Sequence, residues 1–164
     1  MIGMSEAEKS SNARDGLREK LNRRKNELSD RENSFLSGKR ILFAEDDMTN
    51  AHLMMRILSA KGMKADFAKD GNTAMQMFAK SEEHYYDAVI LDVHMPVVNG
   101  HEAALAIRSM RRADCRSVPI IAVTAFEAAE EKELSREAGI SVHLTKPVDP
   151  YMLYKTLEEL LPRS

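Results

Sequence analysis

The stretch Ala88-Val-Ile-Leu-Asp92-Val-His-Met-Pro-Val-Val-Asn-Gly100 decides the fold of this chain. Its first four residues are all apolar, and they predict a strand that is buried on both faces and delivers Asp92 to its carboxyl end. Met95-Pro96 and Asn99-Gly100 then predict a turn that leads into a helix. Ligands of open parallel sheets bind at the carboxyl ends of the strands, so Asp92 is a candidate functional residue.

A second acidic group follows another apolar stretch. Ile41-Leu-Phe-Ala44 predicts a buried strand, and Glu45-Asp46-Asp47 comes directly after it. If both strands belong to one parallel sheet, their ends bring three or four carboxylates together. Two carboxylates 4 Å apart repel by roughly 4 kcal/mol at an effective dielectric constant near 20, and a divalent cation relieves that repulsion. Carboxylate oxygens are ligands that Mg²⁺ prefers, so we expect a magnesium site.

Strands and helices alternate from Lys39 onward. The predicted strands span residues 40–44, 64–68, 88–91, 119–123 and 141–144. The predicted helices span residues 49–60, 72–80, 101–110, 128–138 and 150–161. Gly62 and Gly139 suit helix stops, and Leu53, Ile57 and Leu58 are predicted to face the sheet. Five β-α units with apolar strands predict a doubly wound α/β sandwich whose five helices cover a parallel sheet.

Residues 1–38 have a different texture from the rest and are predicted to form a charged helical extension and linker before a domain at 39–164. Leu21, Leu28 and Phe35 recur every seven residues, but Arg24 and Arg31 fill the companion positions of a coiled coil. We expect a solvated helix over Leu17–Arg31, after Gly16, and a linker at Asn33–Gly38. Pairing of two chains, or attachment to an upstream module, is the alternative.

Composition excludes several classes of protein. Apolar residues make up 43% of the 164 residues and charged residues 30%, which is ordinary for a globular domain. No apolar run approaches the roughly 20 residues that span a bilayer, and no secretory signal is present, so we expect no membrane partner and a cytoplasmic location. The single cysteine, Cys115, suits a reducing compartment and is predicted to be a bystander thiol beside a surface loop. Residues 39–164 hold 16 Lys/Arg and 19 Asp/Glu, so a nucleic-acid partner is not expected.

The remaining strand ends supply a hydroxyl and an amine. Thr124 follows the strand 119–123, and Lys146-Pro147 follows the strand 141–144. Phosphoryl transfer needs mainly positioning and neutralisation of charge. A metal ion, Lys146 and Thr124 would neutralise or bond the phosphoryl oxygens while the Asp92 carboxylate attacks in line, forming an aspartyl phosphate.

Four motifs in this order resemble the receiver domain of two-component response regulators over residues 39–163. The motifs are Ile41-Leu-Phe-Ala-Glu-Asp-Asp47, Tyr86-Asp-Ala-Val-Ile-Leu-Asp92-Val-His-Met-Pro96, Pro119-Ile-Ile-Ala-Val-Thr124-Ala and Leu144-Thr-Lys146-Pro147. The resemblance implies a flavodoxin-like sheet of order 2-1-3-4-5 and a cis bond between Lys146 and Pro147.

The resemblance also implies a role for each site residue. Asp92 would be the phosphoacceptor, and Mg²⁺ would be held by Glu45, Asp46, Asp92 and the backbone carbonyl of His94. Thr124 and Lys146 would complete the catalytic set with Asp92, and Thr124 would act as the switch hydroxyl.

Two positions depart from the family pattern. His143 stands where the family often has an aromatic switch residue, so an imidazole would swing inward with weaker packing or stay exposed. Asp47 adds negative charge near the expected metal, which would favour the cation or slow an anionic phosphoryl donor.

Several other residues are expected to be surface residues. Four histidines show no zinc-type spacing and are predicted to be exposed: His52, His84, His94 and His101. The acidic residues of the helix 128–138 and the loop before it are predicted to form a solvated face: Glu127, Glu130, Glu131 and Glu133.

We therefore expect a phosphoacceptor domain that takes a phosphoryl group from a histidine kinase or a histidine phosphotransfer protein. A downstream protein would dock on the helix 128–138, the strand 141–144 and the helix 150–161, and a homodimer is left open. The chain ends at Ser164, so it is expected to be a single-domain regulator or the terminal receiver of a hybrid kinase, and not a turnover enzyme on its own.

Two rival functions were weighed against this expectation. Haloacid-dehalogenase-type phosphatases carry Asp-x-Asp-x-Thr after the first strand, whereas Glu45, Asp47 and Thr49 stand here, and the remaining length leaves no room for a cap domain. A receiver-like module that docks partners without being phosphorylated is the second rival, and the intact motif set argues against it.

Overall fold

The computed structural model of the protein describes residues 3, 5–125 and 129–163, with the backbone alone for 27–34. The chain divides into two compact units, Met1–Phe35 and Leu36–Ser164. Among the described helices, none has both the length and the apolar character that crossing a bilayer requires.

The N-terminal helix α1 runs from Glu6 to Leu36 and is longer at both ends than the predicted helix. Gly16 does not interrupt it. Its start is capped reciprocally, because the Ser5 N–H donates to Glu8 Oε2 at 2.8 Å and the Glu8 N–H donates to Ser5 Oγ at 3.3 Å. This capping box satisfies two backbone donors of the first turn.

The second unit contains the predicted five-stranded parallel sheet, whose order β2-β1-β3-β4-β5 is confirmed. Its strands are β1 (Arg40–Ala44), β2 (Lys64–Ala68), β3 (Ala88–Asp92), β4 (Ile120–Thr124) and β5 (Val142–Thr145). Its further helices are α2 (Met48–Ser59), α3 (Gly71–Lys80), α4 (Gly100–Arg108), α5 (Ala129–Glu137) and α6 (Pro150–Leu160). Residue 128, the predicted start of α5, lies outside the described residues.

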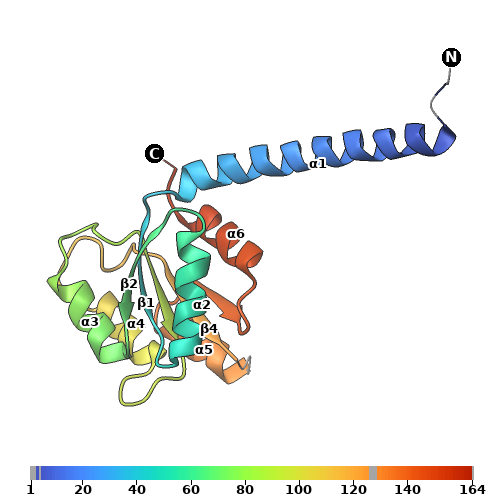
Figure 1. Ribbon diagram of the computed structural model, residues 1–164. Helices are drawn as coiled ribbons and strands as arrows, with labels where there is room; N and C mark the ends of the chain where they lie inside the picture. Colours follow the sequence, from blue (N-terminus) through green and yellow to red (C-terminus); the bar gives the residue numbers. More distant parts are fainter. Residues whose placement is uncertain (1–2, 4, 126–128, 164) are drawn as a thin grey trace. The chain divides into compact units, whose positions relative to one another are not determined.

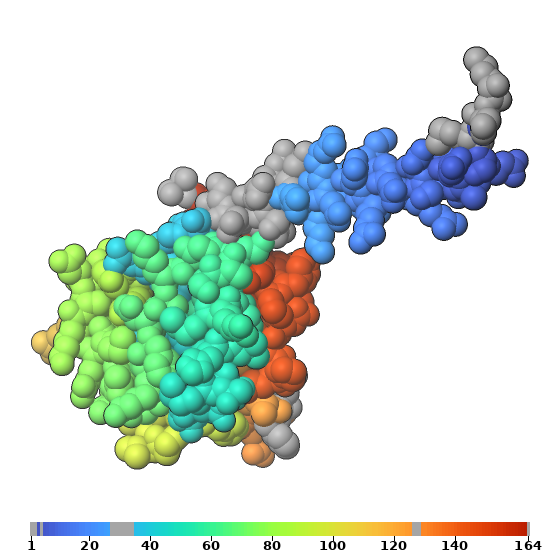
Figure 2. Space-filling model, in the orientation of Figure 1, coloured from blue at the N-terminus to red at the C-terminus, as the bar shows by residue number. Residues whose placement is uncertain are grey.

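Helices cover both faces of the sheet (Figure 1). The strand residues of one face form a core with α3 and α4, in which Phe78 and Ile107 are fully buried. On the other face lies α2, beside α6, as both views show (Figures 1 and 2), and the Tyr154 hydroxyl of α6 donates to the Ile57 carbonyl at 2.6 Å. Ile57 and Leu58 are buried as predicted, but Leu53 is 47% exposed, so its predicted place against the sheet is wrong.

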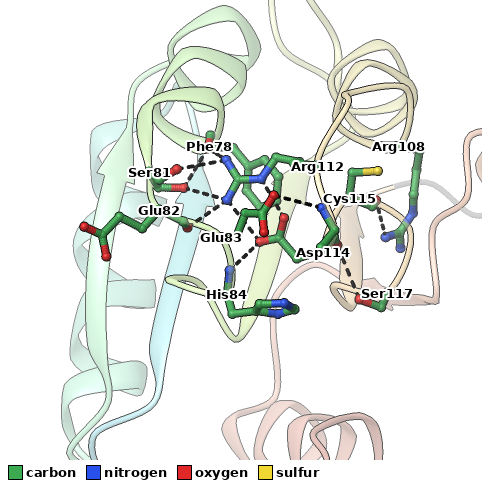
Figure 3. A network of polar contacts seen from close by, with 11 residues as sticks. Phe78, Ser81, Glu82, Glu83, His84, Arg108, Arg112, Asp114, Cys115 and Ser117 are labelled. Atoms are coloured by element: carbon green, nitrogen blue, oxygen red, sulfur yellow. Dashed lines mark hydrogen bonds and ion pairs between the residues drawn. The ribbon is translucent and has the colours of Figure 1, made fainter.

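Arg112 joins the loops that precede β3 and β4 (Figure 3), and Arg108 joins the loops that precede β4 and β5. The guanidinium of Arg112 pairs with Asp114 at 2.6 Å and lies over the Phe78 ring, 4.4 Å from its centroid. It also donates to the carbonyls of Phe78, Ser81 and Glu82. Arg108 donates instead to the carbonyls of Cys115, Val118 and Gly139. Both side chains thus satisfy loop carbonyls that no strand partner reaches.

The pair of Arg112 and Asp114 is a test of this architecture. Arg112→Met should lower the free energy of unfolding by about 3 kcal/mol, because it leaves the buried Asp114 carboxylate without its partner. Burial alone would raise the pKa of Asp114, but the bonds from Arg112 and from the His84 N–H outweigh burial and lower it. The stabilisation is therefore full above the unfolded pKa and is lost as pH falls through the lower folded pKa.

Urea denaturation at several pH values measures this effect. Arg111→Met removes the charge of an exposed neighbour and is the matched control, which should change stability by less than about 0.5 kcal/mol. Equal stability of the Arg112 and Arg111 variants would contradict the assigned role.

Candidate functional site

The register of the sheet gathers the predicted functional residues at one edge. Leu91 of β3 lies between Ala44 of β1 and Ala122 of β4, so Glu45 and Asp92 leave neighbouring strands at the same level, and Thr124 lies one residue further along β4. Thr124 in turn pairs with Thr145, which precedes Lys146. Parallel strands end at a common edge, and for this reason residues far apart in the chain converge there.

Three carboxylates form the acidic part of the site. Glu45, Asp46 and Asp92 offer ligand atoms that all lie within 4.8 Å of one another, and in the part of the chain that the structure describes no other group of His, Cys, Asp and Glu does so. Glu45 and Asp92 are 6% and 4% exposed, whereas Asp46 is exposed. Buried and clustered acids of this kind require a cationic partner.

Asp47 does not belong to this group. Its carboxylate is the N-cap of α2 and accepts from the Asn50 N–H at 2.9 Å, and its own N–H donates to Glu45 Oε1 at 3.2 Å. Capping is an ordinary use of aspartate at this position. The negative charge that Asp47 was expected to add near the metal therefore faces the N-terminus of α2.

Lys146 supplies the cationic partner. Its Nζ lies 2.8 Å from Glu45 Oε2 and 3.1 Å from Asp92 Oδ2, and the predicted cis bond between Lys146 and Pro147 is present. Burial raises the pKa of the Glu45 carboxyl to about 7, aided by the neighbouring Asp92 and opposed by the bond from Lys146. Burial also opposes the charge of Lys146, but its bonds to Glu45 and Asp92 outweigh burial and raise its pKa.

The turn after β3 is held against the end of that strand. The His94 N–H donates to Asp92 Oδ1 at 3.2 Å, and the Gly100 N–H donates to the Val93 carbonyl at 3.0 Å. A Cβ at Gly100 would lie 2.4 Å from the Asp92 carbonyl oxygen, so only glycine allows this approach. Val97 adopts a φ of 67°, which is unusual for a β-branched residue, and its side chain is 95% exposed.

The predicted switch residues lie on β4 and β5. Thr124 ends β4 and is 1% exposed, and its carbonyl accepts from the Lys146 N–H at 2.8 Å. His143 pairs with Ala122 in the sheet and is half-buried, and its role as a switch stays a prediction.

Two residues, His101 and Glu131, are less exposed than the surface positions expected of them. His101 is half-buried, and its Nε2 lies 2.6 Å from the Ser135 hydroxyl of α5. Glu131 is not part of a fully solvated face, because its Oε1 lies 2.9 Å from the His94 Nε2. Cys115 is a free but buried thiol. Glu127 lies outside the described residues, while Glu130 and Glu133 are exposed as expected.

The donor set of the acidic group fits Mg²⁺. It consists of carboxylate oxygens, which hard cations prefer, and it leaves coordination positions for water or phosphoryl oxygens. The ammonium of Lys146 faces Glu45 and Asp92, and these two acids with Asp46 carry three negative charges against its one positive charge when all are ionised. Glu45, Asp46 and Asp92 would hold the ion, with the His94 carbonyl as a further oxygen.

Comparison with known proteins defines the class. The sequence profile of the response regulator receiver domain matches residues 41–158. Hybrid signal transduction histidine kinase I of Dictyostelium discoideum is 35% identical over 120 residues, which cover 72% of this chain and 7% of that protein. The matched segments span between 5% and 16% of the length of the curated relatives.

Two solved structures have the same fold. One is the receiver domain of a sensor histidine kinase from Pseudomonas aeruginosa, which has a magnesium ion coordinated in its active-site cleft. It is 30% identical to this chain with a TM-score of 0.68, and the match covers 98% of that domain and 76% of this chain. The other is the receiver domain of a Saccharomyces cerevisiae response regulator, solved in complex with a histidine phosphotransfer protein. It is 25% identical with a TM-score of 0.66, and the match covers 89% of that domain and 76% of this chain.

The chain belongs to the receiver domain family of two-component signalling. The edge of its sheet carries the acidic group, the lysine and the hydroxyl at the strand ends where the motifs predict them.

Removal of the ammonium tests the charge balance of the site. Lys146→Met should lower the melting temperature in the absence of Mg²⁺, because Glu45 and Asp92 lose their counter-charge at a cost of about 1–3 kcal/mol. Saturating Mg²⁺ should restore more stability to the variant than it adds to the unaltered protein, since the cation then replaces the ammonium. Thermal denaturation with and without Mg²⁺ measures both effects.

The matched control is Lys155→Met, which removes an exposed ammonium from α6. Its melting temperature and its response to Mg²⁺ should follow those of the unaltered protein. If Mg²⁺ stabilises the Lys146 and Lys155 variants equally, Lys146 does not balance the acidic group.

Proposed function

We propose that this receiver accepts a phosphoryl group from phosphohistidine onto Asp92 and thereby switches a partner-docking surface. The observation that carries the proposal is the position of the Asp92 carboxylate. Its Oδ2 lies 3.1 Å from the Lys146 ammonium, and it shares the acidic group with Glu45 and Asp46. Residues 39–164 would act as the receiver and residues 1–38 as a helical linker.

The proposed transfer is a direct displacement at the phosphorus atom of the phosphohistidine. A carboxylate oxygen of Asp92 forms the new O–P bond while the P–N bond to the donor imidazole breaks, and its electron pair stays on that nitrogen. Lys146 and the Thr124 hydroxyl would each bond a phosphoryl oxygen, with Thr124 moving toward it as a switch. Mg²⁺, when held by the acids, would neutralise further charge on those oxygens. Positioning and charge neutralisation supply most of the catalysis in such reactions.

Phosphorylation assays test the acceptor. Asp92→Ala should abolish Mg²⁺-dependent labelling by a small phosphoryl donor such as acetyl phosphate, because no nucleophile remains at the strand end. Asp149→Asn is the control, since it removes an exposed acid while asparagine still caps α6. Labelling should persist in the control and should appear as an acid-stable, base-labile acyl phosphate. Undiminished labelling of the Asp92 variant would disprove the assignment.

The phosphoryl donor would be a histidine kinase or a histidine phosphotransfer protein. The yeast receiver that resembles this chain was solved in complex with such a transfer protein. Here the exposed apolar side chains Met48 and Leu53 of α2 lie near the site, and Leu53 lines a pocket that also contains Asp92, Lys146 and Pro147. Apolar contacts at this rim would exclude water from the transferring group.

A charged substitution separates docking from chemistry. Leu53→Asp should slow transfer from a phosphorylated histidine phosphotransfer protein by about tenfold or more, because one charge in an apolar contact costs more than 1.4 kcal/mol. Labelling by acetyl phosphate, which needs no docking surface, should fall by a clearly smaller factor, since only the added negative charge beside the site opposes it. Leu105→Asp on α4 is the control, since Leu105 has a similar exposed fraction, 54% against 47%. An equal effect of both variants on protein-dependent transfer would exclude α2 as the docking surface.

The output would pass through α5, β5 and α6. New negative charge at Asp92 would draw the Thr124 hydroxyl, and His143 on the adjacent strand would change its packing. A downstream protein, or a second copy of the chain, would then bind the altered surface. The chain would act stoichiometrically, so its activity is a change of affinity and not turnover of a substrate.

A further inference from the structure

We propose that His94, His101 and Glu131 form a second cation site, selective for a transition-metal ion such as Zn²⁺ and separate from the acidic site. The three residues come from different elements: His94 follows β3, His101 lies in the first turn of α4, and Glu131 lies on α5. All three line one open pocket between these elements. The inference does not depend on phosphoryl transfer to Asp92.

The first two ligands are nearly in place. His94 Nε2 and Glu131 Oε1 are 2.9 Å apart. Two ligand atoms of a tetrahedral zinc ion at its usual bond lengths lie roughly 3.3 Å apart, so a few tenths of an ångström of separation would admit the ion. The zinc ligand would be the His94 side chain, whereas the carbonyl of the same residue is the predicted further ligand of Mg²⁺.

The carboxylate also has unused capacity. Glu131 Oε2 is buried and has no hydrogen-bond partner among the residues that the structure describes. A buried carboxylate oxygen without a donor loses its hydration and gains nothing in return. A metal ion bound at this carboxylate would compensate that loss.

His101 is the third ligand. It is half-buried, and its Nε2 contacts the Ser135 hydroxyl at 2.6 Å. Ser135 and Glu131 are four residues apart on α5 and therefore lie on the same face, one turn from each other. Burial lowers the pKa of His101, against the attraction of Glu131, and favours the neutral imidazole that binds metals.

Closure of the site requires His101 to leave Ser135. Of the groups in the described residues, only Glu45, Asp46 and Asp92 already bring three ligand atoms within 4.8 Å. The His101 ring would turn from Ser135 toward Glu131, which lies one helical turn earlier on α5. This movement exchanges a single hydrogen bond, worth about 1 kcal/mol, for a metal bond that is much stronger.

The donor types determine which ion is selected. Two imidazole nitrogens and one carboxylate oxygen suit Zn²⁺, Cu²⁺ or Ni²⁺, whereas Mg²⁺ prefers oxygen ligands alone. The two sites of this receiver would thus discriminate between hard and borderline cations.

Binding would restrain the output surface. Ser135 is the buried residue of α5, so little apolar packing holds this helix to the sheet. A metal ion joining Glu131 to His94 and His101 would tie α5 to the turn that follows the phosphoacceptor strand. Zn²⁺ would therefore favour one position of α5.

The test is Zn²⁺ binding by the full chain, measured by competition with a chromophoric chelator in saturating Mg²⁺, which occupies the acidic group. We expect one equivalent of Zn²⁺ and, with Co²⁺ in its place, visible absorption bands of nitrogen and oxygen ligation. His94→Asn, His101→Asn and Glu131→Gln should each weaken binding by at least about tenfold.

Two exposed histidines elsewhere supply matched controls. His52→Asn on α2 and His84→Asn before β3 should leave the affinity for Zn²⁺ unchanged. The proposal is overturned if the unaltered protein takes up no Zn²⁺ in excess Mg²⁺, or if the control variants lose affinity as much as the three ligand variants do. Loss of phosphorylation in the Asp92 variant bears on the acceptor alone and leaves this result untouched.

Discussion

The second unit depends on the balance of charge between Lys146 and two nearly buried carboxylates. Glu45 and Asp92 come from adjacent strands, and neither could lose its hydration without a cation beside it. The ammonium of Lys146 meets both, at 2.8 and 3.1 Å. The parallel sheet and the turn closed by Gly100 hold Glu45 and Asp92 at one edge, where Lys146 meets both. What remains of the negative charge, including that of Asp46, makes this edge a place for a divalent cation.

Much of this arrangement could be predicted from the sequence, because the central strands β1, β3 and β4 are buried on both faces. The continuous apolar run of β1 placed that strand at the residues where it occurs, and the polar residues that follow the apolar runs marked the functional edge. The bounds of β2 were also predicted correctly, although its residues alternate in burial. For β3 and β4 the prediction ended one residue early, before Asp92 and Thr124. Both residues pair within the sheet, although each is predicted to serve the site with its side chain. The strand order and the cis bond followed only from the resemblance to receivers.

The differences arose where contacts between distant elements decide a residue's environment. Hydrophobic periodicity placed Leu53 against the sheet, but Met54 and Ile57 fill that face and Leu53 is left at the rim. No spacing rule joins His101 to Ser135, since the two meet only when α4 and α5 pack side by side. The long α1 did have a local signal, Ser5 and Glu8 three residues apart, which identifies a helix start before the predicted one.

The turn between β3 and α4 connects the two sites of the receiver. It begins at Asp92, carries the imidazole of His94 toward Glu131, and ends near His101, which reaches α5 through Ser135. The His94 N–H is itself bonded to the Asp92 carboxylate. A change in charge at Asp92 therefore acts on the same short segment that holds α5, and a ligand that holds α5 acts in turn on the backbone beside Asp92. Because coupling between two sites is reciprocal, the amount by which a cation at the histidines alters the free energy of charging Asp92 equals the amount by which that charge alters the binding free energy of the cation.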